Sequence, residues 1–164
     1  MGILLGACGG DHATQAAPEE HSARDFYAAP LEAALDDVAE RLVTRGFTPE
    51  GERVRGFLVE GTAGSTPLAL RSGECSVVVL EASGALVETV LRVHGPEGGE
   101  LARSAGGPGH AALRYCPVNT GSYYISYSAR RGSGLYALAS FRGPNGIELD
   151  LAALFPESSA EAEP

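Results

Sequence analysis

The chain has 164 residues and a mass of 16.9 kDa, which is enough for one domain with a hydrophobic core and too little for two. Its 44% hydrophobic and 20% charged residues are typical of a globular protein and argue against a wholly disordered chain or a multi-span membrane protein. A net charge of −9 argues against a nucleic-acid partner, because contacts with phosphates need clustered cations.

The first eight residues end in a short motif at a cysteine. Leu5-Gly6-Ala7-Cys8 resembles the lipobox of bacterial lipoproteins, which implies lipidation at Cys8, and Gly9 after it is typical of lipoproteins of the outer membrane. A secretory signal has a basic start and about 7–15 apolar residues, whereas no Lys or Arg precedes Cys8 and the apolar run is short. Two interpretations stay open: residues 1–8 are a truncated signal whose start codon is assigned too late, or the motif is fortuitous.

Residues 9–24 are polar, without period, and rich in Gly, Ala and Pro, so we expect a disordered tether. The other two cysteines, Cys75 and Cys116, form an even pair, which predicts a disulfide in an oxidising envelope. Two separate buried thiols are the alternative. No other segment has the ~20 apolar residues that a membrane-spanning helix needs.

From Asp25 to Gly46 the pattern predicts an amphipathic helix. Its apolar stripe, with spacings of four, three and four, consists of Leu31, Leu35, Val38 and Leu42. Pro30 is expected in the first turn and Gly46 just past the end, and Asp37 and Arg41 are spaced to pair across one turn. We expect the helix to lie against the domain core; a partner-binding helix is the alternative.

The 22 glycines and ten prolines divide the following region into short segments with period two. Strands are predicted at residues 54–59, 67–71, 75–82, 86–93, 111–116, 123–129 and 135–141. No helical segment separates them, which predicts an antiparallel sandwich or barrel. Residues 75–80 are apolar on both faces, which predicts a central strand covered on both sides, with the helix as one cover.

Alternation within residues 123–128 separates two faces of one strand. The inward residues are expected to be Tyr123, Ile125 and Tyr127. Aromatic and hydroxyl groups on a flat sheet can contact sugars or peptides, so the opposite face is the best candidate for a ligand surface. This candidate consists of Tyr124, Ser126, Ser128 and Arg130. An ordinary exposed sheet face is the alternative.

The helix and sandwich domain is predicted over residues 25–147, with its strands within residues 53–142 and a turn at Pro144-Asn145-Gly146. An acidic tail is predicted over residues 148–164, and it starts with a short amphipathic segment up to Phe155.

Several turn and core motifs of the strand region resemble one family of exported bacterial domains. They are LRSGEC at 70–75, GPEG at 95–98, LAR at 101–103, LRYCP at 113–117, GSY at 121–123 and GSGLY at 132–136. Over about residues 40–142 the chain looks like a pre-peptidase C-terminal domain, in the cysteine-paired variety of myxobacterial envelope proteins. The resemblance implies a jelly-roll-like β-sandwich, usually an accessory domain beside a secreted hydrolase.

The chain departs from that family where cation ligands would lie. The Asp-Leu-Asp-Leu stretch of the family corresponds to residues 88–91, where Glu88 is the one carboxylate, and Ser104 stands where an Asp is often found. A calcium site needs six to eight oxygen ligands, so we carry over no cation site.

Four histidines are the candidates for acid–base chemistry near neutral pH: His12, His21, His94 and His110. The first two fall in the tether, and the other two fall at strand ends or turns without a nucleophile motif beside them. The sequence also has no zinc-ligand spacing. We predict no catalytic residue, no cofactor and no metal.

These features predict a non-catalytic lipoprotein of the bacterial envelope, anchored to the outer membrane through Cys8 on its periplasmic or surface face. Its one helix and mainly β, antiparallel jelly-roll-like sandwich would bind or scaffold an envelope protein or a polysaccharide. The alternative is an accessory or regulatory subunit of a secreted hydrolase.

Overall fold

The protein is described by a computed structural model over residues 23–155, without the side chains of 23–28 and 105. The lipobox, most of the predicted tether and residues 156–164 lie outside this range. The elements are α1 (Ala23–Thr44), β1 (Thr48–Leu58), β2 (Ala63–Leu70), β3 (Glu74–Ala82), β4 (Leu86–His94), β5 (Glu100–Ala105), β6 (His110–Tyr115), β7 (Gly121–Gly132), β8 (Gly134–Pro144) and the 3-10 turn η1 (Ala152–Leu154).

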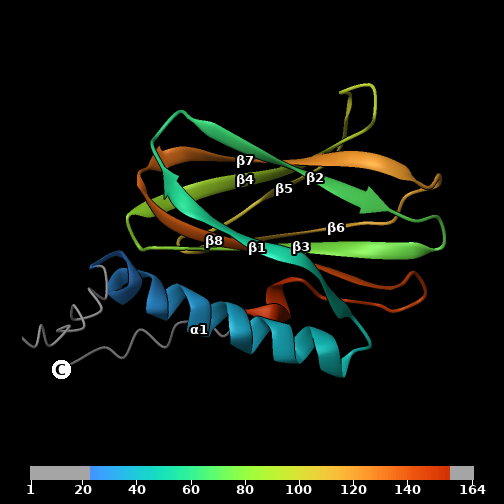
Figure 1. Cartoon of the computed structure of the whole chain (residues 1–164), viewed down its shortest axis with the longest axis horizontal. Coiled ribbons are helices and arrows are strands. Elements are labelled where there is room, and N and C mark those ends of the chain that lie inside the picture. Colours follow the sequence, from blue (N-terminus) through green and yellow to red (C-terminus); the bar gives the residue numbers. More distant parts are fainter. Residues whose placement is uncertain (1–22, 156–164) are drawn as a thin grey trace, which may run out of the picture.

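The eight strands form two stacked antiparallel sheets, and α1 lies on one of them (Figure 1). The inner sheet, next to the helix, has the order β1-β8-β3-β6, and the outer sheet has the order β2-β7-β4-β5. Strand 1 pairs with 8, 2 with 7, 3 with 6 and 4 with 5, so the chain is one long antiparallel hairpin rolled into two layers. This is the strand order of a jelly roll, and the predicted jelly-roll-like sandwich is confirmed.

All seven predicted strands are present, but their bounds differ and one strand was missed. The missed strand, β5, consists of ELARSA, which lacks the β-branched and aromatic residues that mark a strand in a sequence. β1 begins at Thr48 rather than Val54. The extra length was hidden because the register shifts between Glu50 and Val54, around a Gly51 with a φ of 70°, and this bulge interrupts the period of two.

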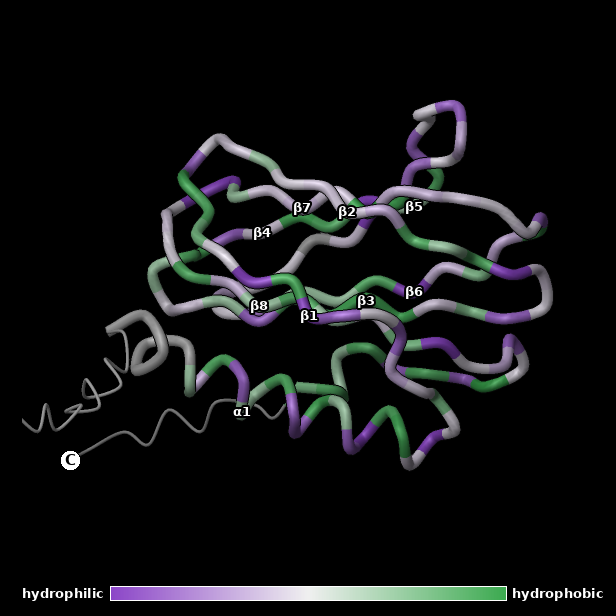
Figure 2. The backbone as a smooth tube through the Cα atoms, in the orientation of Figure 1, coloured by the Kyte–Doolittle hydropathy of each residue, from purple (hydrophilic) through white to green (hydrophobic). Residues whose placement is uncertain are grey.

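The apolar stripe of α1 is buried against the inner sheet as predicted, and Figure 2 shows it alternating with hydrophilic residues along the helix. Two local predictions were wrong. Pro30 lies inside the helix rather than in its first turn, because α1 begins at Ala23. Arg41 donates from Nη1 to the backbone oxygen of Leu154, at 2.8 Å, instead of pairing with Asp37.

The helix ends at Thr44, and Gly46 lies just past its end as the sequence predicts. Gly46 has a φ of 85°, and its N–H donates to the carbonyl of Val43 while the N–H of Phe47 donates to that of Leu42, at 2.9 and 3.0 Å. These two bonds are those of a Schellman motif, which satisfies carbonyls that the last turn leaves without partners. Phe47 is thereby directed into the same cluster as the helix stripe.

β3 is covered on both faces, which confirms the prediction from its unbroken apolar run. Val78 and Leu80 belong to the core between the two sheets, whereas Val77 and Val79 pack with α1. β3 is therefore the layer that both hydrophobic clusters share.

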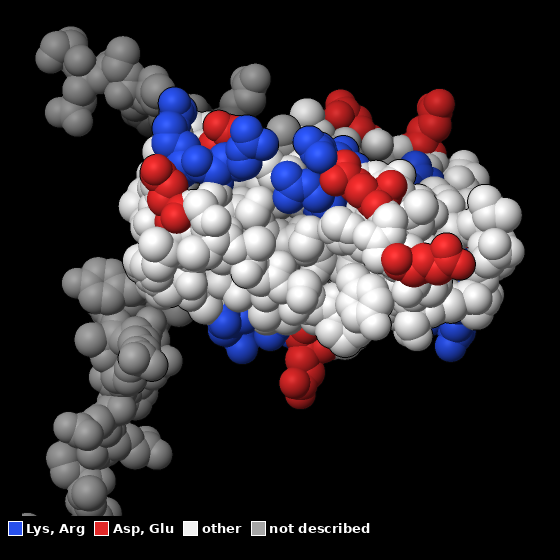
Figure 3. Space-filling model, turned by 90° about the horizontal axis from the view of Figure 1, so that it is seen from above, with Lys and Arg blue, Asp and Glu red and all other residues white. Residues whose placement is uncertain are grey.

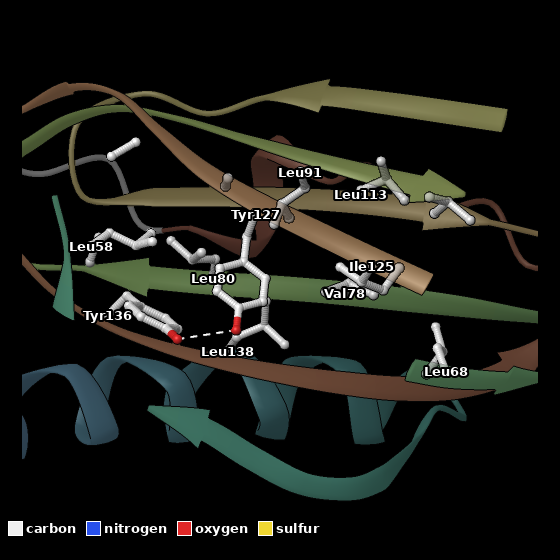
Figure 4. Packing of buried hydrophobic residues seen from close by; sticks show 14 of the residues in the cluster. Leu58, Leu68, Val78, Leu80, Leu91, Leu113, Ile125, Tyr127, Tyr136 and Leu138 are labelled. Carbon is white, nitrogen blue, oxygen red and sulfur yellow. Dashed lines mark hydrogen bonds between the residues drawn. The ribbon is translucent and has the colours of Figure 1, made fainter. Parts of the chain in front are cut away.

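The core between the sheets is closed at one end by two tyrosines. The hydroxyl of Tyr136 donates to that of Tyr127 over 3.2 Å (Figure 4). Each ring lies over a glycine of an edge strand: a Cβ on Gly56 would come within 2.9 Å of Tyr136, and one on Gly64 within 2.3 Å of Tyr127. Glycine is required at both positions because any side chain would displace these rings.

The segment after β8 belongs to the domain rather than to a tail. Leu154 is fully buried, and Ile147, Leu149, Leu151 and Phe155 pack against the helix cluster. The tail boundary predicted at residue 148 is therefore too early. Its glutamates and aspartate suggested solvent, but the apolar residues between them have a partner surface in α1.

Glu81 is the one carboxylate of β3 on the helix side, and only 8% of its surface is exposed. Burial raises the pKa of Glu81 from 4.5 to about 7. Its cross-strand partner is His110, whose ring stacks on Phe155 with centroids 4.0 Å apart and whose pKa burial lowers. Both groups are therefore held towards their neutral forms.

We expect Glu81 to make stability fall as the pH rises from about 4.5 to 7. In that window the folded state keeps a proton on Glu81 that the unfolded state has lost, so the penalty grows until the folded pKa is passed. Glu81→Gln should leave the free energy of unfolding unchanged at pH 4 and raise it at pH 8 by up to about 3 kcal/mol. Urea unfolding at both pH values measures this.

Glu52→Gln, at an exposed glutamate of the β1 bulge, is the matched control and should change stability little at either pH. A Glu81→Gln difference that is equal at pH 4 and pH 8 would contradict the prediction, because a packing change alone has no pH dependence.

Candidate ligand-binding face

The predicted ligand residues lie on the solvent side of the outer sheet. Tyr123, Ile125 and Tyr127 are buried between the sheets, so the residues that alternate with them point outward. Side chains of β4 and β5 complete a surface that we call the arginine–serine face. It consists of Tyr124, Ser126, Ser128 and Arg130 of β7, Arg92 and His94 of β4, and Glu100 and Arg103 of β5.

Cross-strand register arranges these side chains in rows. Arg92 lies opposite Ser126 on one side and Arg103 on the other. In the next row His94 lies opposite Tyr124 and Glu100. Directly opposed residues in a sheet share a face and lie within contact distance, so three strands contribute to each row.

His94 forms a hydrogen bond to Ser126 of the predicted face. The sequence did not show this contact. Its Nε2 lies 2.8 Å from the hydroxyl oxygen of Ser126, and its Nδ1 lies 3.4 Å from the carbonyl oxygen of Gly98. A carbonyl only accepts, so Nδ1 donates to Gly98, and in the neutral ring Nε2 then accepts from the serine hydroxyl. No motif in the sequence places a serine beside this histidine, because the two residues are 32 positions apart and only register joins them.

A Ser–His pair is also the beginning of a nucleophilic site. Here the serine belongs to the middle strand of an open sheet surface, and its other register partner is Ser65 of β2. The geometry therefore fixes an imidazole and a hydroxyl on a flat face, an arrangement suited to hydrogen bonding with a ligand.

Two arginines of this face share one carboxylate. Arg103 donates from Nε and Nη2 to the two oxygens of Glu100, at 2.8 and 2.9 Å, and the Nε of Arg92 lies 3.3 Å from the same group. The hydrogen bond from Arg103 and the charges around it lower the pKa of Glu100. Arg92 also donates to the hydroxyl of Ser128 over 3.3 Å. The cluster keeps a net positive charge and several N–H donors.

Tyr124 is the aromatic group of the face, and 45% of its surface is exposed. Its register partner on β2 is Pro67, and the β2 residues opposite Ser126 and Ser128 are the small Ser65 and Ala63. A ring therefore stands at one end of a low, hydroxyl-lined surface.

The charges of the described surface are unevenly distributed. Figure 3, which looks onto the outer sheet, shows two groups of basic side chains, each next to acidic ones. Arg92, Arg103, Arg130 and Arg131 lie here with Glu88 and Glu100, and Glu60 accepts from the N–H of Gly132 next to Arg131, so four basic groups face three acidic ones although the whole chain has a net charge of −9. On the opposite side of the molecule, α1 presents Glu32, Asp36, Asp37 and Glu40.

Other candidate places in the described chain are less equipped. A pocket of about 440 Å³ lies between the β4–β5 turn and the segment before β7, beside the exposed Leu101 and Val118. Within residues 23–155 we find no group of three His, Cys, Asp or Glu residues that could hold a metal ion. α1 and η1 are not long and apolar enough to cross a membrane. His12 and His21 lie outside the described residues.

Cys75 and Cys116 form a disulfide. They continue the β3–β6 ladder by one step beyond the pair Ser76 and Tyr115, which joins the start of β3 to the end of β6. The bond closes a loop with a sequence separation of 41 residues that contains β4, β5 and their turns, including half of the arginine–serine face.

No protein-family model matches the chain, and no curated protein matches it. Solved structures do match, among them PliG of Aeromonas hydrophila, a periplasmic lysozyme inhibitor of g-type lysozyme. The match has 18% identity and a TM-score of 0.43, and it covers 59% of this chain and 86% of that one. The β-sandwich that the pre-peptidase C-terminal resemblance implies is present; membership of that family stays a prediction.

We expect reduction of the disulfide to lower the free energy of unfolding by about 4 kcal/mol at most, the loop-closure value for a loop of this length. The midpoint of thermal unfolding should fall by roughly 10 °C. Scanning calorimetry with and without reductant measures the change.

The double variant Cys75→Ala and Cys116→Ala is the control, since it should unfold at the temperature of the reduced protein and be insensitive to reductant. An unchanged midpoint after complete reduction would show that the loop is held by the ladder alone.

Proposed function

We propose that the protein is a non-catalytic lipoprotein of the bacterial envelope whose disulfide-bonded β-sandwich binds a component of that compartment. The observation that carries the proposal is the Cys75–Cys116 disulfide. Disulfides persist in oxidising compartments such as the bacterial periplasm and are reduced in the cytosol. A bond that closes a loop across half of the sandwich is therefore evidence for export.

The lipobox at Leu5–Cys8 supports attachment to the outer membrane. Between Cys8 and the first residue of α1, Ala23, there are 14 residues, which span at most about 50 Å when extended. An acyl chain on Cys8 would therefore keep the sandwich near the membrane surface and leave its faces accessible to other envelope components.

The arginine–serine face supports binding as the activity. Its polar groups are held in place by the His94–Ser126, Arg92–Ser128 and Arg103–Glu100 contacts. Groups that are ordered before a ligand arrives lose less entropy on binding. The face is also opposite to α1, so a ligand there would not disturb the buried helix stripe.

The test is fractionation of cells that express the protein from its own gene. We expect the wild-type protein in the outer-membrane fraction with an acylated Cys8, and the Cys8→Ser variant in the soluble fraction of the envelope. Immunoblotting of the fractions and mass spectrometry of the N-terminal peptide measure this.

Thiol alkylation before and after reduction separates export from anchoring. Cys75 and Cys116 should react only after reduction in both the wild type and Cys8→Ser. A cytoplasmic protein with two reactive thiols would overturn the proposal as a whole, whereas an oxidised but soluble wild-type protein would overturn the lipid anchor alone.

A further inference from the structure

We propose that the arginine–serine face binds a polysaccharide whose sugar rings carry carboxylates. The proposal rests on the proposed function, since it names the ligand of that binding module. It follows from three features of the face: an excess of guanidinium groups, paired hydroxyls of opposite hydrogen-bonding character, and an exposed aromatic ring at one end.

The guanidinium groups favour an anionic ligand. All 12 basic residues of the chain are arginines, and Arg92, Arg103, Arg130 and Arg131 lie on this face or at its end. Arg103 uses Nε and Nη2 on Glu100, and Arg92 uses Nε and Nη1 on Glu100 and Ser128, so each keeps N–H donors for a ligand.

Glu100 shows which anion the site fits. Its carboxylate is held by the two parallel N–H groups of Arg103 while Arg92 approaches it from the neighbouring strand. A carboxylate on a ligand is the same chemical group, and the N–H groups that Glu100 and Ser128 leave free on the Nη1 and Nη2 atoms of both arginines can donate to it. The face therefore already holds one carboxylate between two arginines of neighbouring strands.

The serine hydroxyls of the face favour a sugar over a simple anion as the ligand. With the His94 ring neutral and protonated on Nδ1, Ser126 donates to His94 and so presents an acceptor, whereas Ser128 accepts from Arg92 and so keeps a donor. Sugar hydroxyls both donate and accept, and two neighbouring serines of opposite character match them. The exposed ring of Tyr124, beside Pro67, offers an apolar surface for a sugar ring.

The length of the face favours a polymeric ligand. From Tyr124 to Arg130 the strand extends about 20 Å, with the Arg92–Arg103 cluster and the Arg130–Arg131 pair at separate positions along it. The intervening β2 residues Ala63 and Ser65 are small. A polymer with repeated charges can contact both groups at once, and many weak contacts then add to a useful affinity.

Titration calorimetry with three probes tests the proposal, on the soluble full-length Cys8→Ser protein at low ionic strength. We expect polygalacturonate to bind and its fully methyl-esterified form, which has the same sugar backbone without charge, to bind at least tenfold more weakly. Poly-glutamate, which has the carboxylates without the sugar rings, should also bind at least tenfold more weakly. Raising the salt concentration should weaken the binding of polygalacturonate.

Variants assign the binding to this face. Arg103→Gln and Arg130→Gln should each weaken polygalacturonate binding by roughly tenfold, the usual effect of losing a hydrogen bond to a charged group. Tyr124→Ala should weaken binding of polygalacturonate and leave that of poly-glutamate unchanged. Arg45→Gln, the same charge change at the end of α1, and Val118→Ser, at the separate pocket, are the controls and should bind as the parent does.

Equal affinity for the esterified polymer would overturn the role of charge, and equal or higher affinity for poly-glutamate would make an acidic polypeptide the ligand. Loss of binding in Val118→Ser with retention in Arg103→Gln would place the site in the pocket. Each variant is first shown to unfold at the parent temperature. None of these results affects export or acylation, so a failure here is distinguishable from a failure of the proposed function.

Discussion

The burial of β3 on both faces is the constraint from which the architecture follows. A strand with valine or leucine at four consecutive positions cannot leave either side in water, so it needs two covering layers. The outer sheet covers Val78 and Leu80, and α1 covers Val77 and Val79. The helix is thus part of the core, because its apolar stripe faces the inner sheet.

The rolled hairpin explains why residues distant in sequence form the arginine–serine face. In a jelly roll the strands that meet in the outer sheet come from the second, fourth, fifth and seventh positions of the chain. Arg92 and Ser128 are therefore neighbours although 36 residues separate them. The disulfide lies in the other sheet, at the step where β3 meets β6, and it ties together the ends of the loop that supplies β4 and β5.

Much of the fold was predictable because its signals are local. The spacing of Leu31, Leu35, Val38 and Leu42, the helix end at Gly46 and the alternation of residues 123–128 each depend on near neighbours. The outward set on β7 was predictable for the same reason. The partners His94, Glu100 and Arg103 were not, because cross-strand register is fixed by the whole roll and β5 carries no strand signal of its own.

The division of charge between the two sides of the molecule follows from the same layering. α1 carries Glu32 and Asp36, which bind Arg53 and, for Glu32, also Arg55 of β1, so these arginines are used within the fold. On the outer sheet, Arg92 and Arg103 share a single carboxylate. Arg53 and Arg55, which hold the helix to β1, are thus neutralised, whereas Arg92 and Arg103 on the outer sheet keep an excess of positive charge. An anionic ligand would be repelled by the helix side and attracted to the outer sheet, so it would approach the molecule from the side of the outer sheet.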